Sequence, residues 1–204
     1  MKRNISCPCG RTFSVQAPQE IDLDQYPEYI EKIGAGTFMT FTCPLCKKKH
    51  KPEFPVMLLW KSKNIILEAL TELERGEFYL RKKGSFSFET VIGYPELADR
   101  IAVIKDALEP AVIETLKYYL LLKAEEVYPD RDINAWYIGK DASGIVFHLD
   151  GIKTGEVAEM KVPQAVYDKT CEDYRKHPKN EVFASLRSRS YLSVQNMHRP
   201  DILK

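Results

Sequence analysis

The alternation of apolar and polar residues predicts a series of short strands in the first 70 residues. Residues 1–6 and 12–17 flank a turn in which Gly10 can take backbone angles closed to other residues, so we expect an antiparallel hairpin. Three further strands are expected at residues 37–42, 53–60 and 65–70. Residues 67–75 also fit a helical pattern, and the sequence leaves that choice open.

Helix signals lie between and after these strands. Pro27 is typical of a helix start and Gly34 of a helix stop, so a short helix is expected there. Pro95 and Pro110 stand where a first-turn proline opens a helix, which predicts two more helices before residue 127. The second of these carries a wide apolar band, made of Val112, Ile113, Leu116, Tyr119, Leu120 and Leu122. The band predicts core packing, with the seam of a homodimer as the alternative.

The last third of the chain is expected to form a second, β-rich unit. Strands are expected at residues 133–138, 145–149, 156–162, 182–187 and 190–195. One helix is expected to start at Pro163 and to end before His177. The whole chain is therefore predicted to be an α+β protein, with a first domain at residues 1–126 and a β-rich C-terminal appendage at residues 127–204.

Four of the five cysteines stand in two close pairs, which is the strongest chemical signal in the sequence. One residue separates Cys7 from Cys9, and two residues separate Cys43 from Cys46. Thiolates at such spacing can converge on one ion from a single turn, and four thiolates give the closed tetrahedral site of structural zinc. The spacing therefore predicts cysteine knuckles of the zinc-ribbon kind, with Cys7, Cys9, Cys43 and Cys46 as ligands of Zn²⁺.

Three other interpretations of these cysteines stay open. His50 follows Cys46 by four positions and could replace Cys7 as the fourth ligand. A redox pair at Cys43 and Cys46 would need a helix to begin there, which the prolines shortly after the pair oppose. The cysteines could also be buried residues that hold no metal.

Composition narrows the class of protein. The 204 residues include 30 Lys and Arg against 29 Asp and Glu, and 44% are apolar, which excludes a disordered tail, a fibre and a bulk polycation. No apolar run approaches the roughly 20 residues of a membrane span, and the first residues lack the apolar stretch of a secretory signal. We therefore expect a cytoplasmic protein without a membrane span.

A local cluster of lysines makes nucleic-acid binding a second hypothesis. Residues 47–51 contain four lysines directly after the second cysteine pair, and a basic edge suits phosphate binding. Residues 1–60, 61–128 and 129–204 nevertheless sum to +2, −2 and +1, so no segment is strongly basic. The basic residues at 81–83 and 187–189 would extend a patch only if folding placed them beside the lysines. A protein partner is therefore favoured, and nucleic acid is the alternative.

Enzymatic chemistry is not indicated by the remaining polar residues. His148, His177 and His198 are scattered and have no partner at the spacing of a triad or a metal site. Asp22 and Asp24 are expected to cap a helix start rather than to bind a cation. Cys171 falls on a predicted helix and is expected to be a small buried residue.

Several stretches resemble a known family. The motifs Cys7-Pro8-Cys9-Gly10 and Cys43-Pro44-Leu45-Cys46, with later stretches at residues 97–103 and 113–117, are similar to the bacterial and archaeal CpXC domain over about residues 1–126. The resemblance implies that these four cysteines are the family's motif cysteines and bind zinc, although the first motif is one residue shorter than the family pattern. It implies no activity. We therefore expect a non-enzymatic, zinc-stabilised interaction module that binds a protein partner or a second copy of itself.

Overall fold

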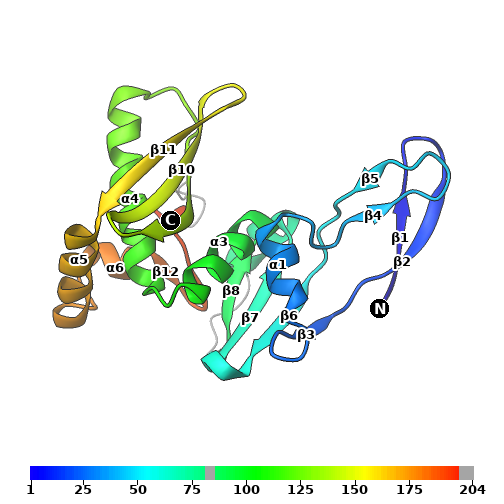
Figure 1. Cartoon of the computed structure of the whole chain (residues 1–204), viewed down its shortest axis with the longest axis horizontal. Coiled ribbons are helices and arrows are strands. Elements are labelled where there is room, and N and C mark those ends of the chain that lie inside the picture. Colours follow the sequence, from blue (N-terminus) through cyan, green and yellow to red (C-terminus); the bar gives the residue numbers. More distant parts are fainter. Residues whose placement is uncertain (81–85, 198–204) are drawn as a thin grey trace. The chain divides into compact units, whose positions relative to one another are not determined.

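The structure, a computed structural model, describes residues 1–80 and 86–197. The chain divides into two compact units, Met1–Ala98 and Asp99–Lys204, and both mix helices with strands, which confirms the α+β prediction (Figure 1). The boundary between the units in the sequence falls within helix α3 (Tyr94–Lys105). The domain boundary expected at residue 126 stays a prediction. Among the described residues, the helices are too short or too polar to span a bilayer.

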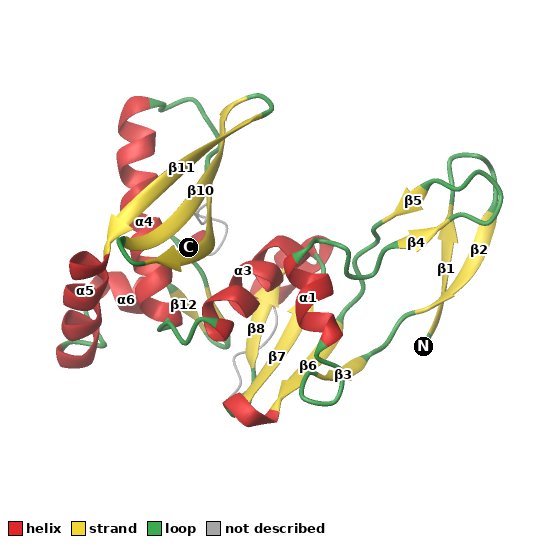
Figure 2. Ribbon diagram, in the orientation of Figure 1, coloured by secondary structure: helices red, strands yellow, loops and turns green. Residues whose placement is uncertain are grey.

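Two antiparallel hairpins in the first unit carry the cysteine turns (Figure 2). They are formed by β1 (Lys2–Ser6) with β2 (Thr12–Gln16), and by β4 (Phe41–Thr42) with β5 (Lys49–His50). The first hairpin confirms the prediction from the alternating pattern. The second hairpin was not predicted, and the strand expected at residues 37–42 is a strand only in its last two residues. Met39 has a positive φ of 50°, so the chain turns before β4 begins.

The other strands of the first unit form a mixed parallel and antiparallel sheet. Its strands are β3 (Glu20–Asp22), β6 (Val56–Trp60), β7 (Ile65–Leu70) and β8 (Glu89–Ile92), in the order β8-β7-β6-β3. β6 and β7 pair antiparallel, whereas β3 with β6 and β7 with β8 pair parallel. Parts of the central strands carry apolar side chains on both faces of the sheet. Leu58, Leu67 and Val91 are almost completely buried.

The helices of the first unit only partly follow the prediction. Helix α1 (Glu28–Gly34) ends at the predicted glycine. Residues 67–70 belong to β7, so the helical alternative there is wrong, and helix α2 (Arg75–Leu80) starts only after a 3₁₀ turn at Glu72–Glu74. A second 3₁₀ turn, Lys61–Lys63, connects β6 to β7. Strand β8 was not predicted, because it offers only four residues of pattern.

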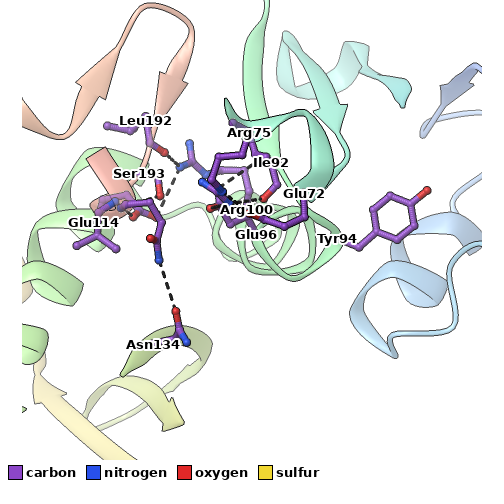
Figure 3. A network of polar contacts seen from close by, with 12 residues as sticks. Glu72, Arg75, Ile92, Tyr94, Glu96, Arg100, Glu114, Asn134, Leu192 and Ser193 are labelled. Atoms are coloured by element: carbon purple, nitrogen blue, oxygen red, sulfur yellow. Dashed lines mark hydrogen bonds and ion pairs between the residues drawn. The ribbon is translucent and has the colours of Figure 1, made fainter. Parts of the chain in front are cut away.

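The guanidinium of Arg75 connects three elements of the first unit (Figure 3). One of its terminal nitrogens donates to Glu72 Oε2 at 2.8 Å, to the Ile92 carbonyl at 3.2 Å and to Glu96 Oε1 at 2.9 Å. The start of α2, the end of β8 and the first turn of α3 are therefore joined by one cation. The Arg75 side chain is largely buried, so these bonds are better protected from water than an exposed ion pair.

In the second unit, helix α4 (Pro110–Val127) packs against an antiparallel sheet (Figure 1). The sheet has the order β11-β10-β9 and consists of β9 (Asn134–Asp141), β10 (Gly144–Lys153) and β11 (Glu156–Pro163). Helix α5 (Gln164–Lys176) follows β11 directly. These elements confirm the predicted strands and the predicted helix after Pro163. Val112, Ile113 and Leu116 of the apolar band lie in the core, whereas Tyr119 and Leu122 are exposed. The homodimer seam stays a prediction.

The strand predicted at residues 182–187 is wrong. Residues Glu181–Ser185 form helix α6, because the Asn180 side chain caps it by accepting a hydrogen bond from the Val182 backbone N–H. The chain then forms a short hairpin of β12 (Arg187–Ser188) and β13 (Tyr191–Leu192), and a 3₁₀ turn at Val194–Asn196. The predicted strand at residues 190–195 is therefore confirmed only in its first half.

Four charged side chains are buried together in the second unit. Lys117 Nζ lies 2.6 Å from Asp99 Oδ1 and 2.8 Å from Glu114 Oε1. Arg100 lies 3.6 Å from the same Glu114 oxygen and donates to the Leu192 carbonyl at 2.7 Å (Figure 3). All four residues are at most 5% exposed. Two cations and two anions balance, which is the condition under which buried charges are tolerated.

Candidate metal centre

The first cysteine pair lies in a tight turn between β1 and β2. The Cys7 N–H donates to the Arg11 carbonyl, and the Gly10 N–H donates to the Cys7 carbonyl, both at 2.9 Å. Gly10 has a φ of +86°, a conformation that costs other residues free energy. The chain therefore folds back immediately after Cys9, and two backbone hydrogen bonds close the turn.

The second pair repeats this pattern with one more residue. The Cys43 N–H donates to the Lys48 carbonyl at 2.9 Å, and the Lys47 N–H donates to the Cys43 carbonyl at 3.0 Å. Lys47 takes the position of Gly10 and has a φ of +62°. In both turns the residue after the second cysteine is left-handed and donates to the carbonyl of the first. The shorter spacing of the first pair thus removes one residue without changing the hydrogen-bond scheme.

The two turns bring four sulfur atoms together. The Sγ atoms of Cys7, Cys9, Cys43 and Cys46 all lie within 4.8 Å of one another, with Cys7 3.5 Å from Cys46 and Cys9 3.8 Å from Cys43. These separations are far longer than the about 2.05 Å of a disulfide bond, and all five cysteines of the chain are free thiols. Ligand bonds of about 2.3 Å to a tetrahedral ion place sulfurs about 3.8 Å apart. The four cysteines therefore fit a single metal ion.

The surroundings favour a thiolate at one of the four positions. The backbone N–H of Cys46, followed by that of Leu45, lowers the pKa of the Cys43 thiol to about 6. At Cys7, the backbone hydrogen bond from Cys9 lowers the pKa, but burial and the neighbouring thiols outweigh it and raise the pKa to about 12. Because a metal is bound by thiolates, loading this centre would release protons to solvent.

His50 contacts the cysteine cluster through Cys7 and is not one of the four clustered residues. Its Nε2 lies 3.2 Å from Cys7 Sγ, and its ring packs edge-on against Phe13 with centroids 5.9 Å apart. The pairing of β4 with β5 places His50 opposite Phe41, and both residues are partly buried. Sequence reasoning considered His50 only as a replacement for Cys7. The structure has both side chains at the site, and a hydrogen bond from an imidazole to a ligand is a common way to fix that ligand.

Comparison with known proteins places this arrangement in a family. A family model described as "CpXC protein" matches residues 5–117, more than half of the chain. The chain belongs to the CpXC family. It is also 28% identical to an uncharacterized protein of Treponema pallidum (strain Nichols), over 95% of this chain and 97% of that protein. No solved structure matches.

The CpXC match contains all four clustered cysteines and ends in α4. The treponemal relative matches nearly the whole chain, so its similarity extends well beyond the CpXC match into the β-rich region. That region therefore accompanies the CpXC segment in at least one other protein.

The other candidate residues are not members of the cysteine cluster. His148 is 4.0 Å from Glu159 on the exposed face of the second unit's sheet, His177 is exposed, and His198 lies outside the described residues. Cys171 is buried on α5, as predicted. Residues 81–83 also lie outside the described residues.

Asp22 and Asp24 hold a turn and do not cap α1. Asp22 accepts from the Asp24 backbone N–H and lies 2.6 Å from Lys61 Nζ, and Asp24 accepts from the Ser62 N–H and hydroxyl. The N-cap position of α1 is Pro27, so the predicted helix cap is wrong, although the carboxylates do accept backbone amides.

Proposed function

We propose that this CpXC protein is a non-enzymatic interaction module, and that Cys7, Cys9, Cys43 and Cys46 hold one structural Zn²⁺. The observation that carries the proposal is the convergence of four thiols from two separate turns within 4.8 Å. An all-sulfur donor set selects zinc or iron over the hard cations, and a Cys₄ site built on two short turns is typical of structural zinc. The two hairpins with their turns then form a zinc ribbon.

The hairpins need such a centre because their strands are short. β1 and β2 have five residues each, and β4 and β5 only two. Isolated hairpins of this length are at best marginally stable in water. A metal that binds only the folded arrangement contributes its binding free energy to folding, which supports a structural role for the ion.

The same donor set supports a role without catalysis. Four protein ligands complete a tetrahedral zinc site, so no coordination position remains for water or a substrate. Elsewhere in the described part of the chain, the histidine that lies nearest a carboxylate is His148, and both it and Glu159 are exposed to solvent. A general acid or base would need to sit in a cleft beside its orienting partner.

A protein partner is proposed for the β-rich second unit. Ile138, Val157 and Val166, on β9, β11 and α5, are each 44% to 57% exposed, and a partner that covered them would remove apolar surface from water. We expect this interaction in a reducing compartment such as the cytoplasm, because all five cysteines are free thiols. Val157→Asp is expected to abolish the association of the second unit with its protein partner, measured by analytical ultracentrifugation or copurification. Cys43→Ser is expected to leave this association intact.

Metal content tests the zinc site directly. Protein purified without added zinc is expected to contain about one zinc per chain by mass spectrometry, and Cys43→Ser is expected to lose it. Cys7→Ser and His50→Ala distinguish the fourth ligand: loss in Cys7→Ser with retention in His50→Ala supports the four cysteines. Cys171→Ser is the matched control, since its thiol lies outside the cluster. Metal-free, reduced wild-type protein, or one iron per chain, would contradict the proposal.

A further inference from the structure

The two cysteine hairpins, taken with their flanking residues as 1–19 and 37–52, carry basic side chains and no acidic ones. Residues 1–19 and 37–52 include no Asp or Glu, and their Lys and Arg residues are Lys2, Arg3, Arg11, Lys47, Lys48, Lys49 and Lys51. The segment between them, residues 20–36, has five acidic residues and one lysine. Sums over residues 1–60 hide this separation, because the acidic segment forms β3 and α1, outside both hairpins.

The hairpin cations are also free to meet a ligand. Six of the seven are exposed, and Arg3, which is half-buried, stacks over the Phe54 ring at 5.5 Å from its centroid. Among the described residues, none of the seven pairs with a carboxylate. Lys47 and Lys51 donate to the backbone carbonyls of Pro44 and Gly36, which leaves their charge uncompensated.

The net charge stays strongly positive when the metal is counted. Four thiolates and one Zn²⁺ together contribute −2, so seven cations leave about +5 on 35 residues. The outward face of the first hairpin adds uncharged polar side chains, namely Asn4, Ser6, Thr12, Ser14 and Gln16. Such hydroxyls and amides donate to phosphate and sugar oxygens in nucleic-acid complexes. The surface thus combines the two kinds of group that bind a phosphodiester backbone.

We propose that the cysteine hairpins bind the phosphate backbone of a nucleic acid. The proposal rests on the structural zinc site, because the metal holds together the two hairpins that share the charge. Affinity would come from phosphate contacts and the accompanying release of counterions, so binding is expected to fall steeply with salt. The outward residues of the hairpins are mostly lysine, hydroxyl and amide side chains, which favours backbone contact over recognition of base edges.

A role in stabilising the thiolates would explain only part of the charge. Lys47 and Lys48 follow Cys46 directly, and nearby cations do lower thiol pKa values. Lys2 lies at the other end of β1 from Cys7, about 16 Å away along an extended strand, and cannot serve the thiolates at that distance. Lys2, Lys48 and Lys49 have no hydrogen bond to the described residues through their side chains, so their removal tests binding without disturbing the turns.

The experiment compares two triple variants by fluorescence anisotropy. Lys2→Gln/Lys48→Gln/Lys49→Gln removes three hairpin charges, and Lys123→Gln/Lys169→Gln/Lys179→Gln removes three exposed charges from the second unit as the matched control. The probes are a labelled 20-nucleotide single-stranded RNA and a 20-base-pair DNA duplex, which share the backbone chemistry and show which form is preferred. The salt range is 50 to 200 mM NaCl, and zinc content is measured on every preparation.

The wild type is expected to bind at least one probe at 50 mM salt. The hairpin variant is expected to bind that probe at least tenfold more weakly, with a salt slope reduced by about 2 to 3, as three lost phosphate contacts require. The control variant should stay within about twofold of the wild type. Zinc-loaded wild type that binds neither probe would overturn this proposal and leave the zinc site standing. Equal weakening in both variants would also overturn it. So would polyglutamate that displaces the labelled probe as effectively as unlabelled nucleic acid of the same charge.

Discussion

Replacing Lys117 by methionine removes the cation that two buried carboxylates share. Lys117 Nζ is 2.6 Å from Asp99 and 2.8 Å from Glu114, and the lysine is only 4% exposed. Methionine keeps the length and apolar character of the stem but leaves a buried site with two anions and one cation. Removing one partner of a buried pair typically costs about 3–5 kcal/mol. We therefore expect the unfolding equilibrium of the second unit to shift by roughly 10² to 10³-fold or more.

Urea unfolding followed by tryptophan fluorescence measures this change. The chain has two tryptophans, one in each unit, so a Trp60→Phe background makes Trp136 the reporter of the second unit. Lys123→Met on the exposed side of α4 is the matched control and should change stability by less than about 0.5 kcal/mol.

A double variant tests whether the balance of buried charges sets the cost of losing Lys117. Adding Asp99→Asn to Lys117→Met leaves Arg100 with Glu114, one cation with one anion, and an oxygen that can still accept from the Tyr137 N–H. We expect it to recover at least about 1 kcal/mol of the loss. A loss below 1 kcal/mol in Lys117→Met, or a double variant less stable than the single one, would refute the reasoning.

Three further perturbations follow from the same structure. Burial raises the pKa of Asp99 to about 6, above its value near 4 in an unfolded chain, so its protonation stabilises the second unit below about pH 4 and this contribution is lost as the pH rises through 6. Asp99→Asn should therefore flatten the dependence of Tm on pH between 4 and 7, and an unchanged profile would contradict this. Lys47→Gly should relieve a left-handed backbone and slow zinc loss to a chelating dye, whereas Gly10→Ala should cost about 1 kcal/mol and speed it. Equal rates in both variants would argue against the strained turns. Stripping the metal with a chelator should unfold the hairpins and leave the Trp136 fluorescence unchanged, and cooperative loss of both signals would count against a local role for zinc.

The cysteine cluster is the part of the site that sequence reasoning anticipated best. Paired cysteines at turn spacing leave few arrangements, and the backbone pattern around Gly10 and Lys47 follows from local chemistry alone. The contact between His50 and Cys7 was missed, because it depends on which residue of β5 pairs with Phe41. That register is set by a two-residue strand, which carries too little pattern to read.

The long, regular elements were predicted and the short ones were not. α4, α5 and the strands β9 to β11 have enough residues for periodicity to show. α6 was mistaken for a strand because a single cap at Asn180 decides its conformation. The buried charges escaped notice for a different reason. Asp99 and Lys117 look like surface residues in the sequence, and only the tertiary fold brings them together.

The positions of the buried charges bear on how the CpXC segment can exist. All four lie within residues 99–117, inside the family match. The backbone groups that form hydrogen bonds with three of them come later in the chain. These are the Tyr137 and Val194 amides and the Leu192 carbonyl. A polypeptide ending at Lys117 would expose these ionised side chains to water or leave them without hydrogen-bond partners. We therefore expect a polypeptide that ends at Lys117 to fold less stably than the full chain, because residues of the β-rich region bond to these buried charges.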